Sequence, residues 1–210
     1  YTGGCNLKCP YCHSRDLVYL KENMYPIVTE KINEYLESHR KDLDGIYISG
    51  GEPLMHEGVV SFLQYAKTLN YKIKIHTNGM FYERLKTILA QKLVDHVSLD
   101  IKNAPSAYAK TCGVEDMDLK DIEKSLDLLK QSAVPYDICV TLVDELHNQA
   151  TIEELGQWIQ GVDTVILQPF EDSETTIDHS LHCPSFEVVF KYKKIFEKYV
   201  KHVKIRGDQA

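Results

Sequence analysis

The sequence contains no apolar run that approaches the roughly 18 residues needed to cross a membrane, so we expect no membrane partner. It also lacks an excess of basic residues, because 24 Lys and Arg are set against 31 Asp and Glu, a formal net charge of -7. Phosphate binding calls for a basic surface, so this balance argues against a nucleic-acid partner. Small molecules or other proteins are the expected partners.

Internal repeats, linkers and low-complexity segments are missing as well. With 210 residues, of which 43% are hydrophobic and 26% charged, the chain is long enough to build one hydrophobic core. We therefore expect residues 1–210 to form a single domain.

Three of the six cysteines lie within eight residues, in the sequence Gly-Gly-Cys-Asn-Leu-Lys-Cys-Pro-Tyr-Cys-His of residues 3–13. A loop can turn the thiols of Cys5, Cys9 and Cys12 toward one centre, and three converging thiolates predict a metal site. Such a thiol cluster is incompatible with an oxidising compartment, so the sequence predicts a cytoplasmic protein. The other cysteines are isolated in sequence, and we expect them to be small buried hydrophobic residues: Cys112, Cys139 and Cys183.

A structural zinc site with His13 as the fourth ligand is one interpretation of this cysteine loop. Closed zinc sites usually take their ligands as two pairs, and no second Cys-x-x-Cys or His pair occurs in the sequence. His13 also directly follows Cys12, which is a poor geometry for a shared tetrahedron. Thiolates suit iron-sulfur clusters too, and three of them can hold a four-iron cluster while one iron has no protein ligand. The iron-sulfur interpretation is favoured.

Together with two later motifs, the cysteine loop resembles the signature of the radical S-adenosylmethionine (SAM) enzymes. The pattern is Cys-x3-Cys-x2-Cys, with the aromatic Tyr11 before the third cysteine. Ser-Gly-Gly-Glu-Pro at 49–53 and Thr-Asn-Gly at 77–79 lie where that family has them. The resemblance implies a [4Fe-4S] cluster that is held by the three cysteines and binds SAM at the remaining iron.

The resemblance also implies where SAM binds. Gly50, Gly51 and Glu52 would bind its amino group, and Asp100 with Lys102 would contact its ribose and carboxylate. Taken alone, the first segment could be a tight turn, and the second, whose side chains share one face of a strand, a structural ion pair. The remaining expected cofactor contacts are Tyr11, Cys12, His13, Thr77, Asn78, Ile101 and Gln168.

Two positions depart from the pattern of the family. His76 stands where related activating enzymes have an Asp that contributes to a monovalent-cation site, and a neutral imidazole supplies no negative charge. We therefore do not expect that cation site here. Glu171 stands where some relatives have a His near SAM, so this contact is not carried over. The remaining histidines, among them His147, form no ligand spacing, and we expect them to have surface or structural roles.

Strand and helix patterns alternate along the chain. Runs rich in β-branched residues predict strands at 45–49, 72–76, 96–102, 136–143 and 164–170. Helical spacing predicts helices at 29–40, with Thr29 as N-cap, and at 57–69, 81–91, 118–131, 151–159 and 185–199. Residues 15–26 show no firm period and predict an extended connection, and the polar segment 172–184 predicts a mobile lid.

This alternation predicts an α/β fold with a parallel sheet and right-handed crossovers, and a site beyond the C-terminal ends of the strands. The resemblance makes the fold more definite, a partial (βα)6 radical SAM barrel. In that family a strand precedes the cysteine loop. Tyr1 and Thr2 would then be the last residues of a first strand that is truncated in this sequence.

The resemblance finally implies an activity. Cys-Pro-Tyr-Cys-His, the Asp-Ile-Lys strand, Leu-His at 146–147 and Val-Lys-Ile-Arg-Gly at 203–207 are similar to the activating proteins of anaerobic ribonucleoside-triphosphate reductase. These enzymes cleave SAM reductively to a 5′-deoxyadenosyl radical, which takes hydrogen from a backbone glycine of the reductase and leaves a glycyl radical. The implied partners are a glycyl radical enzyme and an electron donor such as flavodoxin or ferredoxin. No protein residue is assigned as a general base.

Other interpretations stay open. A radical SAM enzyme that acts on a small molecule, similar to 7-carboxy-7-deazaguanine synthase, would share the size and the cluster. A peptide-modifying enzyme would usually carry an auxiliary-cluster domain, for which the sequence has no second motif. A zinc-binding interaction module, which belongs to another functional class, would cleave no SAM.

Overall fold

The computed structural model describes residues 1–207. Its centre is a parallel sheet in the order β1-β2-β3-β4-β5-β6, so each strand pairs with the next one along the chain. Within the described residues β1 and β6 do not pair with each other, so the barrel is open. The strands are β1 (Gly45–Ile48), β2 (Lys72–Thr77), β3 (His96–Asp100), β4 (Tyr136–Leu142), β5 (Thr164–Pro169) and β6 (His202–Ile205).

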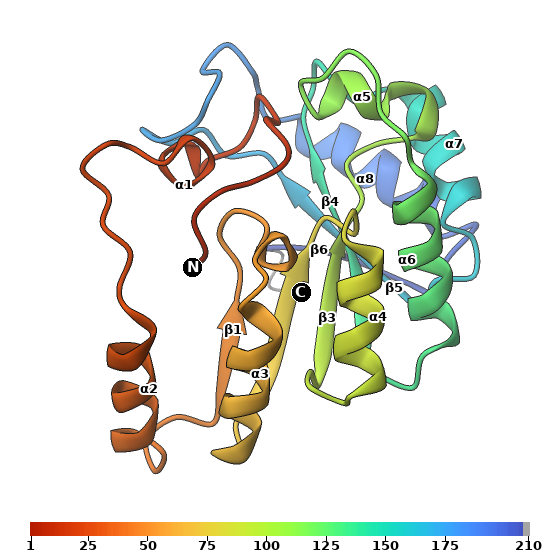
Figure 1. Cartoon of the computed structure of the whole chain (residues 1–210). Helices are drawn as coiled ribbons and strands as arrows, with labels where there is room; N and C mark the ends of the chain where they lie inside the picture. Colours follow the sequence, from red (N-terminus) through yellow and green to blue (C-terminus); the bar gives the residue numbers. More distant parts are fainter. Residues whose placement is uncertain (208–210) are drawn as a thin grey trace.

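Helices connect successive strands and pack beside the sheet (Figure 1). Two short 3-10 turns, η1 (Pro53–Met55) and η2 (Pro105–Ala107), follow β1 and β3. Among residues 1–207, no helix has both the length and the apolar character that a membrane crossing requires. The α-helices are α1 (Arg15–Tyr19), α2 (Thr29–Ser38), α3 (Val59–Thr68), α4 (Tyr82–Ala90), α5 (Tyr108–Thr111), α6 (Lys120–Gln131), α7 (Gln149–Trp158) and α8 (Phe186–Phe196).

The two faces of the sheet differ in chemistry because side chains alternate along each strand. In β2 and β3, the apolar residues Ile73, Ile75, Val97 and Leu99 are at most 1% exposed and belong to the hydrophobic core. The residues between them form the other face and are largely polar, among them His76 in β2. This polar face leads to the C-terminal ends of the strands, where the predicted motifs lie.

The parallel α/β architecture is confirmed, and the boundaries of the predicted strands and helices move by three residues or fewer. Thr2 forms an isolated parallel bridge with Gly50, just beyond β1. Thr2 thus lies beside the end of β1, where the resemblance puts the end of a preceding strand. The predicted strands and helices therefore account for most of the scaffold.

Several local predictions were wrong. Residues 15–26 are not wholly extended, because α1 occupies 15–19; this helix has five residues and buries none, so it leaves no periodic signal. Thr29 is the first residue of α2 and not its N-cap, which is Val28. The four-residue α5 was also missed.

The strand β6 was not predicted either. Its sequence, His-Val-Lys-Ile, alternates in burial as expected for an edge strand. The resemblance had already supplied a strand before the cysteine loop, which brought the expected number to six without residues 202–205.

Candidate functional site

The cysteine loop is attached to the end of β1 by backbone hydrogen bonds, and in Figure 1 this red N-terminal segment lies near the ends of the strands. The N–H of Gly51 donates to the carbonyl oxygen of Thr2, and that of Glu52 to the carbonyl oxygen of Gly4, both at 2.8 Å. A Cβ on Gly51 would lie 1.8 Å from the Gly4 oxygen, and Gly50 has a φ of +122°. Glycine is therefore required at both positions by the approach of the chain's own loop.

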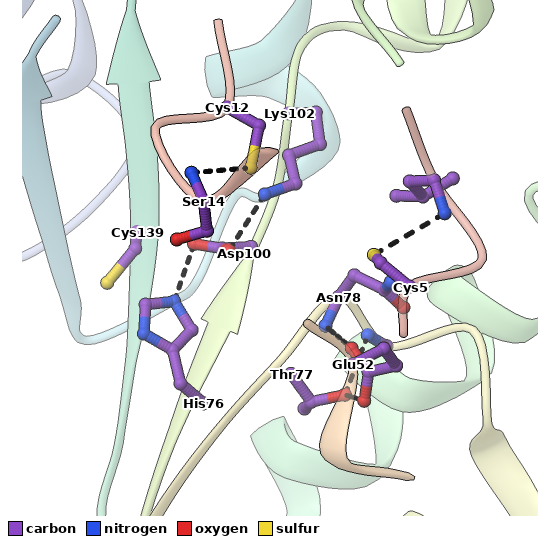
Figure 2. Close-up of polar contacts among 12 residues, drawn as sticks. Cys5, Cys12, Ser14, Glu52, His76, Thr77, Asn78, Asp100, Lys102 and Cys139 are labelled. Atoms are coloured by element: carbon purple, nitrogen blue, oxygen red, sulfur yellow. Dashed lines mark hydrogen bonds and ion pairs between the residues drawn. The ribbon is translucent and has the colours of Figure 1, made fainter. Parts of the chain in front are cut away.

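Glu52 ties this turn to the Thr-Asn-Gly motif (Figure 2). Its carboxylate is 1% exposed and accepts hydrogen bonds from the Leu54 N–H (2.9 Å), the Thr77 hydroxyl (2.7 Å) and the Asn78 N–H (2.7 Å). Burial raises the pKa of Glu52, and these three donors oppose the rise. The Asn78 side chain in turn donates to the Asn6 side chain at 2.8 Å, so the cysteine loop is held from both motifs.

The segment 172–184 is also attached to the cysteine loop. The N–H of Ile177 donates to the carbonyl oxygen of Cys12 at 3.1 Å, and the N–H of Asp178 donates to that of Pro10 at 2.9 Å. The segment for which the sequence predicts a mobile lid is therefore joined to the cysteine loop by backbone hydrogen bonds.

A cavity of about 390 Å³ opens at the C-terminal ends of the strands, within the usual size of small-molecule sites. The thiol-bearing residues Cys5, Cys9 and Cys12 line it. Ile101 does not line it, because its side chain is fully buried in the core. Every other predicted cofactor contact does: Tyr11, Cys12, His13, Gly50, Gly51, Glu52, Thr77, Asn78, Asp100, Lys102 and Gln168.

The spacing of the thiols does not match a zinc site. A Zn–S bond of about 2.3 Å would bring thiolates to roughly 3.8 Å from one another. Among residues 1–207, one group of three side chains has potential metal-donor atoms that all lie within 4.8 Å of one another. This group is His76, Asp100 and Cys139, and it does not include the loop cysteines. The loop cysteines are therefore spread more widely than a single zinc ion requires, and His13 is exposed. A larger, polynuclear centre fits them better.

The loop thiols have unequal environments. Burial raises the pKa of Cys5 to about 11, and it also raises that of Cys12. The neighbouring Cys112 thiol lowers the pKa of Cys9, against the effect of burial. The Lys102 ammonium favours the thiolate form of all three. The chain therefore presents its thiols to the cavity beside a positive charge.

Asp100 is the centre of a polar cluster that lines the same cavity (Figure 2). One carboxylate oxygen lies 2.6 Å from His76 Nε2, and the other accepts a hydrogen bond from Lys102 Nζ at 2.8 Å. Burial opposes ionisation, but His76 and Lys102 outweigh it and hold the pKa of Asp100 well below its usual range. Burial likewise disfavours the charged Lys102, yet Asp100 raises its pKa well above normal. The two side chains meet, as their spacing predicts, and present fixed opposite charges to the cavity.

Sequence reasoning missed several residues of the cavity wall, among them Cys139 and Arg206, and misplaced one cysteine. Cys139 is buried as expected, but it also lines the cavity, and alternation along β4 could have revealed its polar face. Arg206 follows β6 and was missed with that strand. Cys183 is exposed, so the prediction that it is buried was wrong, whereas Cys112 is fully buried as predicted.

Comparisons with known proteins place the chain in a family. The model of the radical SAM superfamily matches residues 1–159. A protein of Methanocaldococcus jannaschii, named by inference as a glycyl-radical enzyme activating enzyme, is 31% identical over 209 residues, which cover 97% of this chain and 85% of the relative. The pyruvate formate-lyase-activating enzyme of Clostridium pasteurianum is 27% identical, over 95% of this chain and 88% of that enzyme. The GTP 3′,8-cyclase of Alkaliphilus oremlandii is 26% identical, over 74% of this chain and 49% of the cyclase.

Solved structures share the fold. SuiB of Streptococcus suis, crystallised with SAM, aligns with a TM-score of 0.76 and 14% identity over 99% of this chain and 49% of SuiB. A domain of a pyruvate-formate lyase-activating enzyme from Bacteroides vulgatus aligns with a TM-score of 0.62 and 19% identity, over 78% of this chain and 99% of the domain. At these identities the likeness establishes the architecture alone, and it agrees with the open parallel sheet.

Proposed function

The chain belongs to the radical SAM superfamily, and on that premise we propose that it activates a glycyl radical enzyme, specifically anaerobic ribonucleotide reductase. The proposed reaction is the reductive cleavage of SAM and the removal of a hydrogen atom from one glycine of the partner protein. Membership of this family implies a [4Fe-4S] cluster and SAM as cofactors. The observation that carries the proposal is that one cavity is lined both by the loop thiols and by polar side chains at the C-terminal ends of the strands.

The residues fit these cofactors. Cys5, Cys9 and Cys12 would hold the cluster, since soft thiolates suit iron-sulfur centres and their wide spacing disfavours a single zinc ion. The chemistry that the bound cofactors supply is one-electron cleavage of SAM to a 5′-deoxyadenosyl radical. The chain contributes a cavity wall, the orientation of SAM and fixed charges.

The charges on the cavity wall suit the polar groups of SAM. Lys102 offers an ammonium to a carboxylate, and Asp100 offers an ionised acceptor to ribose hydroxyls. The carboxylate of Glu52 already accepts three hydrogen bonds from the chain, so its part in binding the amino group of SAM is to hold the turn around Gly51. Ile101 can contribute only its backbone, because its side chain lies in the core.

The similarity to activating enzymes supports a protein substrate. It extends over 97% and 95% of this chain for the proteins of Methanocaldococcus jannaschii and Clostridium pasteurianum. The choice of the reductase among glycyl radical enzymes rests on the motifs at 9–13, 100–102 and 203–207. A flavodoxin or a ferredoxin would supply the electron.

The test is an anaerobic reaction of the reconstituted chain with dithionite, SAM and the reductase encoded in the same genome. The proposal predicts a glycyl doublet in the electron paramagnetic resonance (EPR) spectrum of the reductase. The Cys9→Ala variant should give none, and Cys183→Ala, which removes an exposed thiol, should behave as the parent chain. Cleavage of SAM without a doublet would contradict the partner and direct the search to small molecules such as GTP.

A further inference from the structure

A fourth cysteine, Cys112, lies directly behind the cysteine loop and has no part in the proposed function. It follows α5, is fully buried and does not line the cavity. The N–H of Lys8 donates to the carbonyl oxygen of Cys112 at 3.3 Å. A Cβ on Gly113 would lie 2.5 Å from the carbonyl oxygen of Lys8. The backbone around residue 8 and the backbone at 112–113 are therefore in direct contact.

Cys9 and Cys112 are neighbours across this contact, because the Cβ position of Gly113 also lies 3.7 Å from Pro10. Both cysteines belong to the buried core, and both thiols are free in this structure. A disulfide needs Cα atoms about 4.4–6.8 Å apart and Cβ atoms about 3.5–4.5 Å apart. Two neighbouring cysteines on touching backbones can reach that geometry with a small movement. Cys9 is only 6% exposed, but it lines the cavity, and this is the side from which a soluble reagent would approach its sulfur.

We propose that Cys9 and Cys112 form an intramolecular disulfide in the metal-free chain when a small-molecule disulfide, such as oxidised glutathione, is present. The sulfur of Cys9 attacks the oxidant and releases one thiol, which leaves a mixed disulfide on the protein. The sulfur of Cys112 then displaces the second thiol and closes the bond. The two protein thiols lose two electrons and two protons, which the oxidant carries away as two thiols. Dithiothreitol reverses the reaction.

This bond would control the metal site. It would withdraw one of the three loop thiols from the cavity, and Cys5 and Cys12 alone would leave a four-iron cluster with two protein ligands. It would also protect Cys9 from irreversible oxidation to a sulfinic or sulfonic acid while no metal is bound. This consequence rests on the proposed function, whereas the disulfide itself does not.

The test is peptide mapping of the full chain, freed of metal by anaerobic chelation and then incubated with oxidised glutathione. Remaining thiols are alkylated, and the chain is digested with trypsin without reduction. Cleavage sites at Lys8, Arg15, Lys110 and Lys120 isolate peptides 9–15 and 111–120. We expect a link between these two peptides as the main product, and dithiothreitol should remove it.

Variants assign the link to one sulfur. Peptide 9–15 also contains Cys12, so Cys12→Ser should keep the link and Cys9→Ser should abolish it. Cys112→Ser and Cys112→Ala should both abolish it, and Cys183→Ser is the matched control that should not. A bond confined to peptide 9–15, or glutathione attached to separate cysteines without any link, would overturn the proposal.

Measurements of iron uptake distinguish a failure of the proposed disulfide control from a failure of the proposed function. The oxidised parent chain should take up iron and sulfide only after dithiothreitol treatment, whereas Cys112→Ser, given the same oxidant, should take them up with less dependence on the reductant. Equal uptake by the cross-linked and the reduced parent chain would contradict the control of the metal site. A chain that forms the link but binds no iron under any condition would contradict the proposed function alone.

Discussion

The carbonyl oxygen of Gly4 occupies the space in which a side chain at Gly51 would begin, since a Cβ there would lie 1.8 Å away. This contact joins two motifs that are almost fifty residues apart in sequence, the cysteine loop and the Gly-Gly-Glu-Pro turn. The hydrogen bond from the Glu52 N–H to the same oxygen fixes their distance. The position of the three thiols over the sheet therefore depends on the absence of a side chain at residue 51.

Gly51→Ala should separate the cysteine loop from β1. Overpacking against backbone costs about 1–3 kcal/mol or more, so we expect a lower free energy of unfolding in urea and a loss of most of the iron bound after reconstitution. Gly58→Ala is the matched control, because no atom lies within 4 Å of its Cβ position, and it should leave both quantities nearly unchanged. Normal iron binding by Gly51→Ala would contradict this role of the contact.

Glu52→Gln should weaken the junction between the turn and the Thr-Asn-Gly motif. One carboxylate oxygen becomes an amide NH2 that faces a donor, and an unsatisfied buried group costs about 1–3 kcal/mol. Urea unfolding should show this loss, and calorimetry should show weaker SAM binding. Glu57→Gln, at an exposed neighbouring position, is the control. Unchanged stability would mean that the three hydrogen bonds of Glu52 are dispensable.

Lys102→Met tests whether the Asp100–Lys102 pair binds SAM or serves only as a structural ion pair. A charge-assisted hydrogen bond is worth about 1.5–3 kcal/mol, so its loss should weaken SAM binding by roughly 10- to 100-fold in equilibrium dialysis with the reconstituted enzyme. Lys110→Met changes an exposed lysine and should bind SAM normally. If the pair is purely structural, Lys102→Met should have a lower free energy of unfolding than the parent chain and the same affinity for SAM.

His147 should make the fold sensitive to mild acid. Burial lowers the pKa of His147, although its hydrogen bonds to the backbone carbonyl oxygens of Lys102 and Val143 oppose the shift. The unfolded chain takes up this proton near pH 6.5, whereas the folded chain does so only at lower pH. Stability is therefore complete above about pH 6.5 and is lost as the pH falls below it toward the folded pKa.

The measurement for His147 is the free energy of unfolding in urea at pH 8 and pH 5.5. His147→Gln should show a smaller loss between these values than the parent chain, because its amide does not titrate. His202→Gln changes an exposed histidine and should keep the full loss. An equal loss in His147→Gln would assign the sensitivity to other groups.

Local motifs were enough to predict the parts of the site that lie on one loop or one strand. The three thiols and the facing side chains of Asp100 and Lys102 follow from spacing alone. The three hydrogen bonds that Glu52 accepts could not be predicted from a local motif. Their donors come together only when the turn after β1 meets the end of β2. The contact of Cys112 with Cys9 has the same origin, since it depends on how α5 packs behind the loop.

The elements of the fold also differ in how well the sequence predicts them. Strands with a continuous apolar face, such as β2 to β4, were predicted within a few residues. The short α1 and α5 carry too few residues to show a period, and β6 was passed over in favour of a strand that the resemblance placed before Tyr1. Arg206 was lost from the predicted site for that reason.

Measurements on one reconstituted sample test the central proposal, that the cysteine loop holds an iron-sulfur centre with a free coordination position. The full chain is reconstituted anaerobically with iron and sulfide, its iron, sulfide and zinc are quantified, and the EPR spectrum of the dithionite-reduced protein is recorded before and after SAM is added. We expect about four iron and four sulfide per chain, with a spectrum that SAM changes. Stoichiometric zinc with negligible iron, or a cluster spectrum that SAM leaves unchanged, would contradict it.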